Sequence, residues 1–197
     1  MSVRSHYPSF NVMKEQGAWD DHTQAIVWSR LQPKKELQFF TAEEAQLMGQ
    51  ISSLLVNDQN PEVLDYVVGH IDQALHQSPG EGQREAGVPE ASILVRTGLQ
   101  AIERGAQAQY GCSFTELELQ RQKDFVQQLS RYSAEPKDVW GQIPQKPLFT
   151  KLMSMTVEPY SSHPAVWSDI GYAGPAYPRG YVRTQMGQLD PWEAQPE

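Results

Sequence analysis

The sequence predicts an all-α fold, and three observations lead to this prediction. Apolar residues recur at spacings of three and four along most of the chain, which is the pattern of helices with one buried face. Capping boxes at residues 41–44 and 113–116 mark helix starts. The chain has no alternating β-branched run and no repeat of fixed period. We expect an irregular helical bundle with an extended N-terminal arm and a long C-terminal loop rich in proline and aromatic residues.

Length and charge indicate a single domain spanning residues 1–197. At this length the chain can bury a core without disulfides or metal, and its only cysteine, Cys112, excludes an intrachain bridge. Asp and Glu outnumber Lys and Arg by 24 to 16, which gives a net charge of −8. Nucleic acid and anionic membranes select basic proteins, so we expect neither as a partner.

The sequence also predicts no direct membrane insertion. It has no apolar run long enough to cross a bilayer, and its first thirty residues hold no basic run and no twin arginine. We therefore expect a cytoplasmic location. A periplasmic location is the alternative, if a leader is missing from the sequence or if a partner carries one.

The N-terminal part predicts an arm and then a short helix. Residues 1–18 mix aromatic, proline and glycine residues without a period, which indicates an extended arm. Asp20 or Asp21 can cap the helix that follows, because an Asp side chain accepts backbone N–H bonds of the first turn. Pro33 is expected to end this helix.

Two longer helices follow. The first begins at the capping box of residues 41–44 and ends in the polar stretch of residues 57–60. Pro61 opens the second, because proline suits a first turn whose N–H has no partner. The apolar faces of the two helices consist of Leu47, Ile51, Leu54 and Leu55, and of Leu64, Val67, Val68, Ile71 and Leu75. Gly80, Gly82 and Gly87 then predict a flexible connection.

Three more helices complete the predicted bundle. Pro89 opens one that ends near Gly111, a residue suited to the position after a helix. The capping box of residues 113–116 precedes another, and the last runs over residues 146–157, before Pro159. Their apolar faces consist of Leu94, Val95, Leu99, Ile102 and Ala106, of Leu117, Phe125, Val126, Leu129 and Tyr132, and of Phe149, Leu152, Met153 and Thr156.

Residues 160–197 differ in composition from the predicted helical core at residues 19–159. They hold six aromatic residues, five prolines and four glycines, which predicts a loop and not a helix. Aromatic rings bury large areas, so these rings need a protein surface to cover them. We interpret the segment as a tail that wraps a surface of this chain or of another subunit.

No residue pattern predicts an active site. His70 and His76 are too far apart in sequence to share a helix face as metal ligands, and no nucleotide-binding or nucleophile motif occurs. Cys112 is interpreted as a packed, inert cysteine. His163 could serve as a base, although a surface or interface histidine is the preferred interpretation. We predict no catalytic, cofactor-binding or metal-binding residues in this chain.

Several motifs resemble those of the gluconate 2-dehydrogenase subunit 3 family. The most specific is HPAVWSDIGYAGPAYPRGY at residues 163–181, followed by DPWE at residues 190–193. Weaker matches are YPSFNV at residues 7–12, WDDHT at residues 19–23 and FFTAE at residues 39–43. The resemblance therefore covers most of the chain.

The resemblance implies a noncatalytic small subunit of an FAD-dependent dehydrogenase that oxidises a hydroxyl of a sugar, sugar acid or glycoside. FAD and the reacting groups would belong to a large catalytic subunit of glucose-methanol-choline type. A cytochrome c subunit accompanies the pair in some complexes. Many relatives carry a Tat leader, and the first thirty residues here show none, so we do not expect the export role of those relatives to carry over directly.

The tail supplies the predicted partner interface. Tyr and Trp have few rotatable bonds and prolines restrict the unbound chain, so docking such a segment costs little order. The predicted interface consists of Trp167, Tyr172, Pro175, Tyr177, Arg179, Tyr181 and Trp192, with Arg179 paired to a carboxylate of the large subunit. The alternatives are a transient maturation or export chaperone for the flavoprotein, and an independent enzyme or metal protein that uses His163 or Cys112.

Overall fold

The computed structural model describes residues 5–32, 36–78 and 84–196. Within these residues the chain forms α-helices and 3-10 helices and no strand, which confirms the predicted all-α fold. The predicted helix end at Pro33 and the predicted connection at Gly80 and Gly82 lie outside the described residues. The elements are η1 (Val12–Ala18), α1 (Asp21–Ser29), α2 (Ala42–Val56), α3 (Pro61–Gln77), α4 (Ala91–Tyr110), η2 (Phe114–Glu116), α5 (Leu119–Ser130), α6 (Lys137–Trp140), α7 (Gln145–Ser162) and α8 (Pro164–Asp169).

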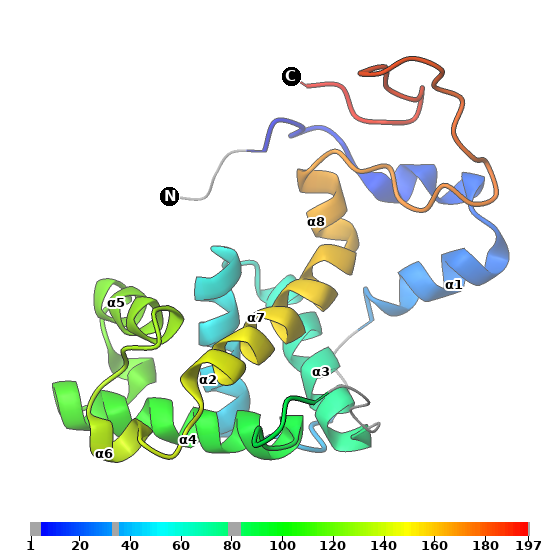
Figure 1. Ribbon diagram of the computed structural model, residues 1–197. Helices are drawn as coiled ribbons and strands as arrows, with labels where there is room; N and C mark the ends of the chain where they lie inside the picture. The colour runs from blue at the N-terminus through cyan, green and yellow to red at the C-terminus, as the bar shows by residue number, and fades with distance from the viewer. Residues whose placement is uncertain (1–4, 33–35, 79–83, 197) are drawn as a thin grey trace.

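The elements lie in two regions (Figure 1). Helices α2 to α7 pack together, and we call the described residues 36–78 and 84–162 the helical bundle. Helix α7 crosses this bundle diagonally and leads into α8. The described residues 5–32 and 163–196 gather around α8, and we call them the terminal lobe. The two ends of the chain therefore lie side by side, with η1 against α8.

The core of the helical bundle is built around α7, which packs against α2, α3, α4 and α5. Leu148 and Leu152 of α7 are buried. Gly98 of α4 faces Leu148 so closely that a Cβ atom at Gly98 would lie 2.7 Å from Leu148 Cδ2. The small residue is what lets α4 approach α7, because any side chain would occupy the space of the leucine methyl groups.

Local signals of the sequence set most helix ends. The Asp20 side chain accepts a hydrogen bond from the Thr23 N–H at 2.9 Å and caps α1. Thr41 and Glu44 form the predicted capping box of α2, and α3 begins at its proline. Gly111 ends α4 with a φ of 78°, a left-handed conformation that costs glycine little.

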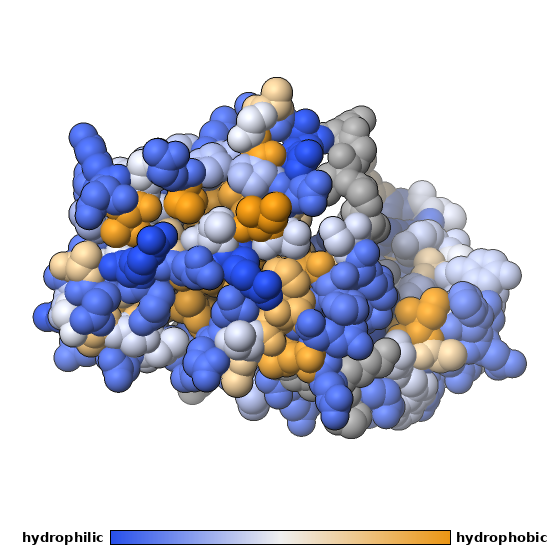
Figure 2. Space-filling model, turned by 90° about the horizontal axis from the view of Figure 1, so that it is seen from below, coloured by the Kyte–Doolittle hydropathy of each residue, from blue (hydrophilic) through white to orange (hydrophobic). Residues whose placement is uncertain are grey.

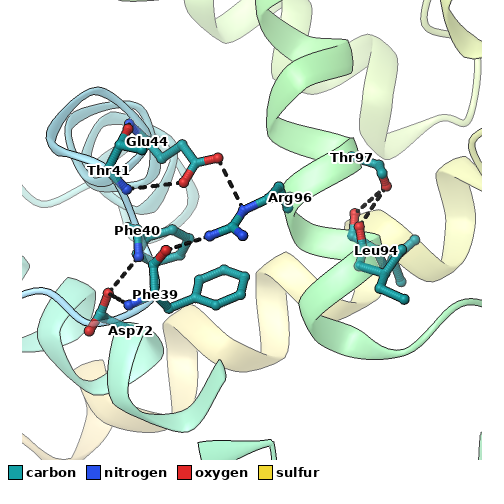
Figure 3. Close-up of polar contacts among 9 residues, drawn as sticks. Phe39, Phe40, Thr41, Glu44, Asp72, Leu94, Arg96 and Thr97 are labelled. Atoms are coloured by element: carbon teal, nitrogen blue, oxygen red, sulfur yellow. Dashed lines mark hydrogen bonds and ion pairs between the residues drawn. The ribbon is translucent and has the colours of Figure 1, made fainter. Parts of the chain in front are cut away.

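A buried carboxylate fixes the chain where it passes from the terminal lobe into the helical bundle (Figure 3). Asp72 of α3 accepts hydrogen bonds from the backbone N–H groups of residues 38–40 at 2.8, 3.0 and 2.8 Å. Arg96 of α4 pairs with Glu44 at 3.3 Å. The Arg96 guanidinium also lies over the ring of Phe39, 4.0 Å from its centroid, and donates to the Phe39 carbonyl.

Two predictions about the chain ends are wrong. The predicted extended arm contains the 3-10 helix η1, because the Asn11 side chain accepts the N–H of Met13 at 2.9 Å and caps it. The predicted C-terminal loop contains α8, because His163 Nδ1 accepts the N–H of Ala165 at 3.2 Å and Pro164 suits the first helical turn.

The predicted stop before Pro159 is also wrong, because α7 continues through this proline to Ser162. Pro159 is buried, and the turn beyond it is tied to other parts of the helical bundle. The Tyr160 hydroxyl donates to Asp58 Oδ2 at 3.1 Å, and the Ser162 and Tyr66 hydroxyls lie 3.1 Å apart. These contacts offset the backbone hydrogen bond that proline removes.

The ends of two other helices differ slightly from prediction. Pro89 lies outside α4, which begins at Ala91 with Glu90 as its cap residue. The capping box of residues 113–116 forms as predicted, but it opens the short η2 turn, and α5 begins later at Leu119.

Candidate functional site

The terminal lobe has an apolar cluster of its own, apart from the core of the helical bundle. Its buried members come from both ends of the chain: Val12, Trp19 and Val27 from the N-terminal part, and Trp167 from α8. Phe10 and Met13 pack against them. Trp167, which the sequence places at a partner interface, thus packs within this chain, and its indole N–H donates to the Ser161 carbonyl at 2.7 Å.

Hydrogen bonds join the N-terminal residues to α8 and the end of α7. The Ser5 hydroxyl donates to the Asp169 carbonyl at 2.7 Å, and the Val12 N–H donates to Ser168 Oγ at 3.1 Å. Arg30, just after α1, donates from Nη1 to the Ser162 carbonyl at 2.7 Å. These bonds fix the orientation of the terminal lobe relative to α7.

Two glycines let the tail lie close to the N-terminal aromatic rings. A Cβ atom at Gly171 would lie 2.7 Å from the ring of Tyr7, and one at Gly174 would lie 2.5 Å from Trp19 Cζ2. Both glycines also have φ near +80°, a conformation that other residues adopt only with strain. The N-terminal rings therefore determine the path of the tail.

The side chain of Arg179 makes its contacts within this chain. Its guanidinium pairs with Glu15 of η1 at 3.4 Å, and Nη2 donates to the Ala173 carbonyl at 2.6 Å. The Trp192 ring lies 4.7 Å from the Arg179 Cζ atom, and only 10% of the arginine side chain is exposed. Arg179 therefore joins η1, the tail and the C-terminal residues, and Glu15 occupies the position that was expected for a carboxylate of the large subunit.

The other residues of the predicted interface differ in exposure. Tyr177 and Tyr181 are the most exposed, and Tyr172 is exposed at 40%. The ring of Tyr172 also packs edge-on against Trp167, with centroids 5.4 Å apart. Pro175 and Trp192 are half-buried. The three tyrosines are thus the rings of this set that the chain leaves to solvent.

Sequence reasoning missed several exposed apolar residues of the terminal lobe, because it considered only the aromatic rings of the tail. Ten of the fourteen large apolar residues that are exposed among the described residues lie in the terminal lobe. The signal was present in the sequence, since residues 170–189 include no Asp or Glu. The missed residues are Ile26, Trp28, Leu31, Ile170, Val182, Met186 and Leu189.

The helical bundle exposes fewer large apolar residues. The four in its described residues lie in separate segments: Ile93 in α4, Leu119 at the start of α5, Tyr132 after α5 and Val157 in α7. On the underside of the molecule, hydrophilic side chains interrupt the apolar areas (Figure 2). The terminal lobe is therefore the candidate binding surface.

The two residues weighed for chemistry lie in packed positions. His163 is buried and not at the surface, which corrects the preferred interpretation, and its ring lies 5.2 Å from that of Tyr66. Burial lowers the pKa of His163 below its ordinary value, and the neighbouring Glu62 opposes this shift. Cys112 is partly buried and packs against the core of the helical bundle.

Burial also raises the pKa of two other groups, Tyr160 in α7 and Asp169 at the end of α8. It raises the pKa of Tyr160 to about 12, and the Asp58 carboxylate that accepts the tyrosine hydrogen bond adds to this shift. Burial and the charge of Asp58 raise the pKa of Asp169 above its ordinary value. In the described residues no group of three or more His, Cys, Asp and Glu side chains could hold a metal ion.

A hollow of about 560 Å³ lies between the end of α1 and the side of α3. Arg30, Tyr66, His70 and several amide and carboxylate side chains line it. It opens against the middle of α3, whereas a dinucleotide pyrophosphate is held at a helix N-terminus. No described helix combines the length and hydropathy that a membrane span requires.

Comparison with known protein families places most of the chain in a described family. The family model described as gluconate 2-dehydrogenase subunit 3 matches residues 42–174, from the start of α2 to the segment after α8. No curated protein and no solved structure matches the chain. The matched range covers more than half of the chain and includes the helical bundle and α8. The chain belongs to the gluconate 2-dehydrogenase subunit 3 family.

Proposed function

We propose that this chain is the noncatalytic small subunit that binds and stabilises the FAD-containing catalytic subunit of a dehydrogenase. The dehydrogenase oxidises a hydroxyl of a sugar, sugar acid or glycoside to a carbonyl. FAD is held by the catalytic subunit, of glucose-methanol-choline type, and supplies the hydride acceptor there. The family membership supports the role of a dehydrogenase subunit.

The observation that carries this proposal is the uneven distribution of exposed apolar residues. The terminal lobe makes up about a third of the described residues but holds ten of their fourteen exposed large apolar residues. Soluble monomers rarely gather such residues in one region, and a gathered set marks a surface that another protein covers. A subunit of a permanent complex has this property, whereas a free-standing protein with this surface risks aggregation.

Co-expression tests the proposal. The chain, carrying an affinity tag, is produced together with a large glucose-methanol-choline-type flavoprotein encoded beside it. We expect the two chains to elute from a sizing column as one peak with a constant ratio of flavin absorbance to protein. We also expect the large chain alone to unfold at a lower temperature. Elution of two separate peaks, with the large chain soluble and fully active alone, would refute the proposal.

The second candidate is a maturation or export chaperone that leaves once the flavoprotein has folded and taken up FAD. The same exposed surface favours it, because a chaperone also presents apolar residues to its client. The mature enzyme distinguishes the two functions. A stable 1:1 complex that persists in the fully flavinylated, active enzyme supports the subunit and excludes the transient chaperone.

A further inference from the structure

The chain forms a closed loop at residues 181–189, here called the C-terminal loop. Asp190 is completely buried, and its Oδ1 atom accepts hydrogen bonds from the backbone N–H groups of residues 182–183 at 2.7 and 2.8 Å. Gln188 Oε1 accepts hydrogen bonds from the backbone N–H groups of residues 184–185 at 3.1 and 3.3 Å. Side chains thus accept hydrogen bonds from four consecutive backbone N–H groups, which gives residues 182–185 a defined path before any partner binds.

The charges of this segment are neutralised within the chain. Arg183 Nη1 lies 3.4 Å from Glu193 Oε1, and Arg183 Nε lies 3.9 Å from Asp190 Oδ2. Arg179 is paired with Glu15, and residues 170–189 contain no acidic residue. Arg183, with 43% of its side chain exposed, is thus paired within this chain and not left for a carboxylate of a partner.

The C-terminal loop exposes four large apolar side chains beside polar ones, which are Arg183, Thr184, Gln185 and Gln188. Met186 is fully exposed, Tyr181 and Val182 are more than half exposed, and Leu189 is 42% exposed. Methionine is unbranched and flexible, and it fills irregular apolar pockets in binding surfaces. The loop therefore presents exposed apolar side chains, with Arg183 as its single charged residue, on a chain whose net charge is −8.

On the basis of the proposed function, we infer that the C-terminal loop enters an apolar groove of the catalytic subunit. Asp190 and Arg179 act within this chain to hold the loop in its docking shape, and neither pairs across the interface. A preformed loop loses less conformational entropy on binding than a disordered segment does. The loop lies beyond the family match at residues 42–174.

The charge of the chain favours this occupant over two others. A second copy of the chain carries the same net charge of −8, which opposes self-association through the loop. An anionic membrane would repel the chain for the same reason. A catalytic subunit with an apolar groove meets neither obstacle.

Charge substitutions at exposed positions test the contact. The full-length chain is titrated into the purified catalytic subunit, and the Kd is measured for Met186→Asp and Leu189→Asp. We expect each to raise the Kd at least about 30-fold, as for a residue at the centre of an interface. Ile93→Asp and Leu119→Asp, at exposed apolar positions of the helical bundle, are matched controls, for which we expect less than a threefold change.

Further measurements test whether the loop is preformed and whether its charge is paired within the chain. Asp190→Ala leaves every exposed side chain of the loop unchanged, so a rise of about tenfold in Kd would come from the loss of loop order. Limited trypsin cleavage after Arg183 should be faster in this variant. Since Arg183, the charged residue of the loop, is paired within the chain, raising NaCl from about 50 to 500 mM should change the wild-type Kd less than about threefold.

Several outcomes would overturn the inference while leaving the proposed function intact. They are wild-type affinity in both Met186→Asp and Leu189→Asp, wild-type affinity in Asp190→Ala, or a wild-type Kd that rises steeply with salt. Dimerisation of the isolated chain, or its binding to phosphatidylcholine vesicles, would assign the loop to another occupant if Met186→Asp abolishes it. Absence of any wild-type complex would instead refute the proposed function.

Discussion

At the scale of single residues, two buried carboxylates each accept hydrogen bonds from backbone N–H groups that lie outside the helices. Asp72 accepts hydrogen bonds from three backbone N–H groups where the chain passes into the helical bundle. Asp190 accepts hydrogen bonds from two backbone N–H groups in the C-terminal loop. Burying an ionised carboxylate is costly unless N–H donors replace its water. Each aspartate therefore both depends on its segment and fixes the path of that segment.

Removing the Asp72 carboxylate should destabilise the fold. Asp72→Ala leaves three backbone N–H groups without their acceptor, and we expect a loss of about 3 kcal/mol in the free energy of unfolding. Urea denaturation followed by circular dichroism measures it. Asp65→Ala is the matched control, because Asp65 is exposed on the same helix, and a surface change of this kind should cost less than about 0.5 kcal/mol. Equal losses in the two variants would contradict the role of Asp72.

His163 predicts a specific dependence of stability on pH. Because burial lowers its pKa in the folded chain below the ordinary 6.5, the unfolded chain binds the proton more tightly. Stability is therefore complete above about pH 6.5 and is lost as the pH falls toward the folded-state pKa, at no more than about 1.4 kcal/mol per pH unit. Protonation of Nδ1 would also remove the acceptor that caps α8.

Unfolding measured at pH 7.5 and at pH 5.5 checks this dependence. His163→Asn keeps an acceptor for the α8 cap but does not titrate, so it should lose less stability than the wild type between the two pH values. His76→Asn, at an exposed position of α3, should retain the wild-type loss. A wild-type loss that persists in His163→Asn would assign the pH dependence to other groups.

At the scale of elements, the sequence predicts what short-range chemistry determines. The caps at Asp20 and Thr41 act within four residues of themselves, so they could be recognised without the fold. The continuation of α7 through Pro159 could not be recognised from the sequence, because it depends on Tyr66 and Asp58, about one hundred residues away in the chain. Helix α8 was missed for a different reason: its short capping signal stands in a segment whose composition indicated a loop.

The packing of α4 against α7 is sensitive to a single methyl group. Gly98→Ala would place Cβ against Leu148, and we expect a loss of about 1–3 kcal/mol from overpacking. Gly49→Ala in α2 is the matched variant, because its Cβ would meet only Val68 at an ordinary 3.6 Å. Since alanine favours helices over glycine, Gly49→Ala should gain about 0.5–1 kcal/mol. Thermal unfolding measures both, and a shift of the same sign in both would contradict the close approach.

At the scale of the whole molecule, the candidate surface was predictable by its place in the chain and not by its exact residues. Its composition pointed to the tail, where Tyr177 and Tyr181 are indeed exposed. Trp167 and Arg179 are covered instead, because the N-terminal residues Trp19 and Glu15 reach them. No local pattern shows that the first and last parts of the chain meet.

The sizes of the two apolar clusters predict that the molecule opens in parts. The cluster of the terminal lobe has four buried members among the described residues, whereas the core cluster of the helical bundle has twenty-five, one of which, Val166, lies in α8. Regions with little buried apolar contact open at lower free energy. Hydrogen exchange followed by mass spectrometry should therefore show faster exchange in α1 than in α3 and α4.

Binding of the catalytic subunit should then protect the terminal lobe selectively, because a ligand stabilises the part of the molecule that must be ordered to bind it. We expect exchange in α1 and residues 175–190 to slow at least about tenfold in the complex, with little change in α4. Protection confined to the helical bundle would place the contact elsewhere.

Equal protection of α1 and α4 in the free chain would show instead that the two clusters open as one unit, so that binding at the terminal lobe would stabilise the whole chain.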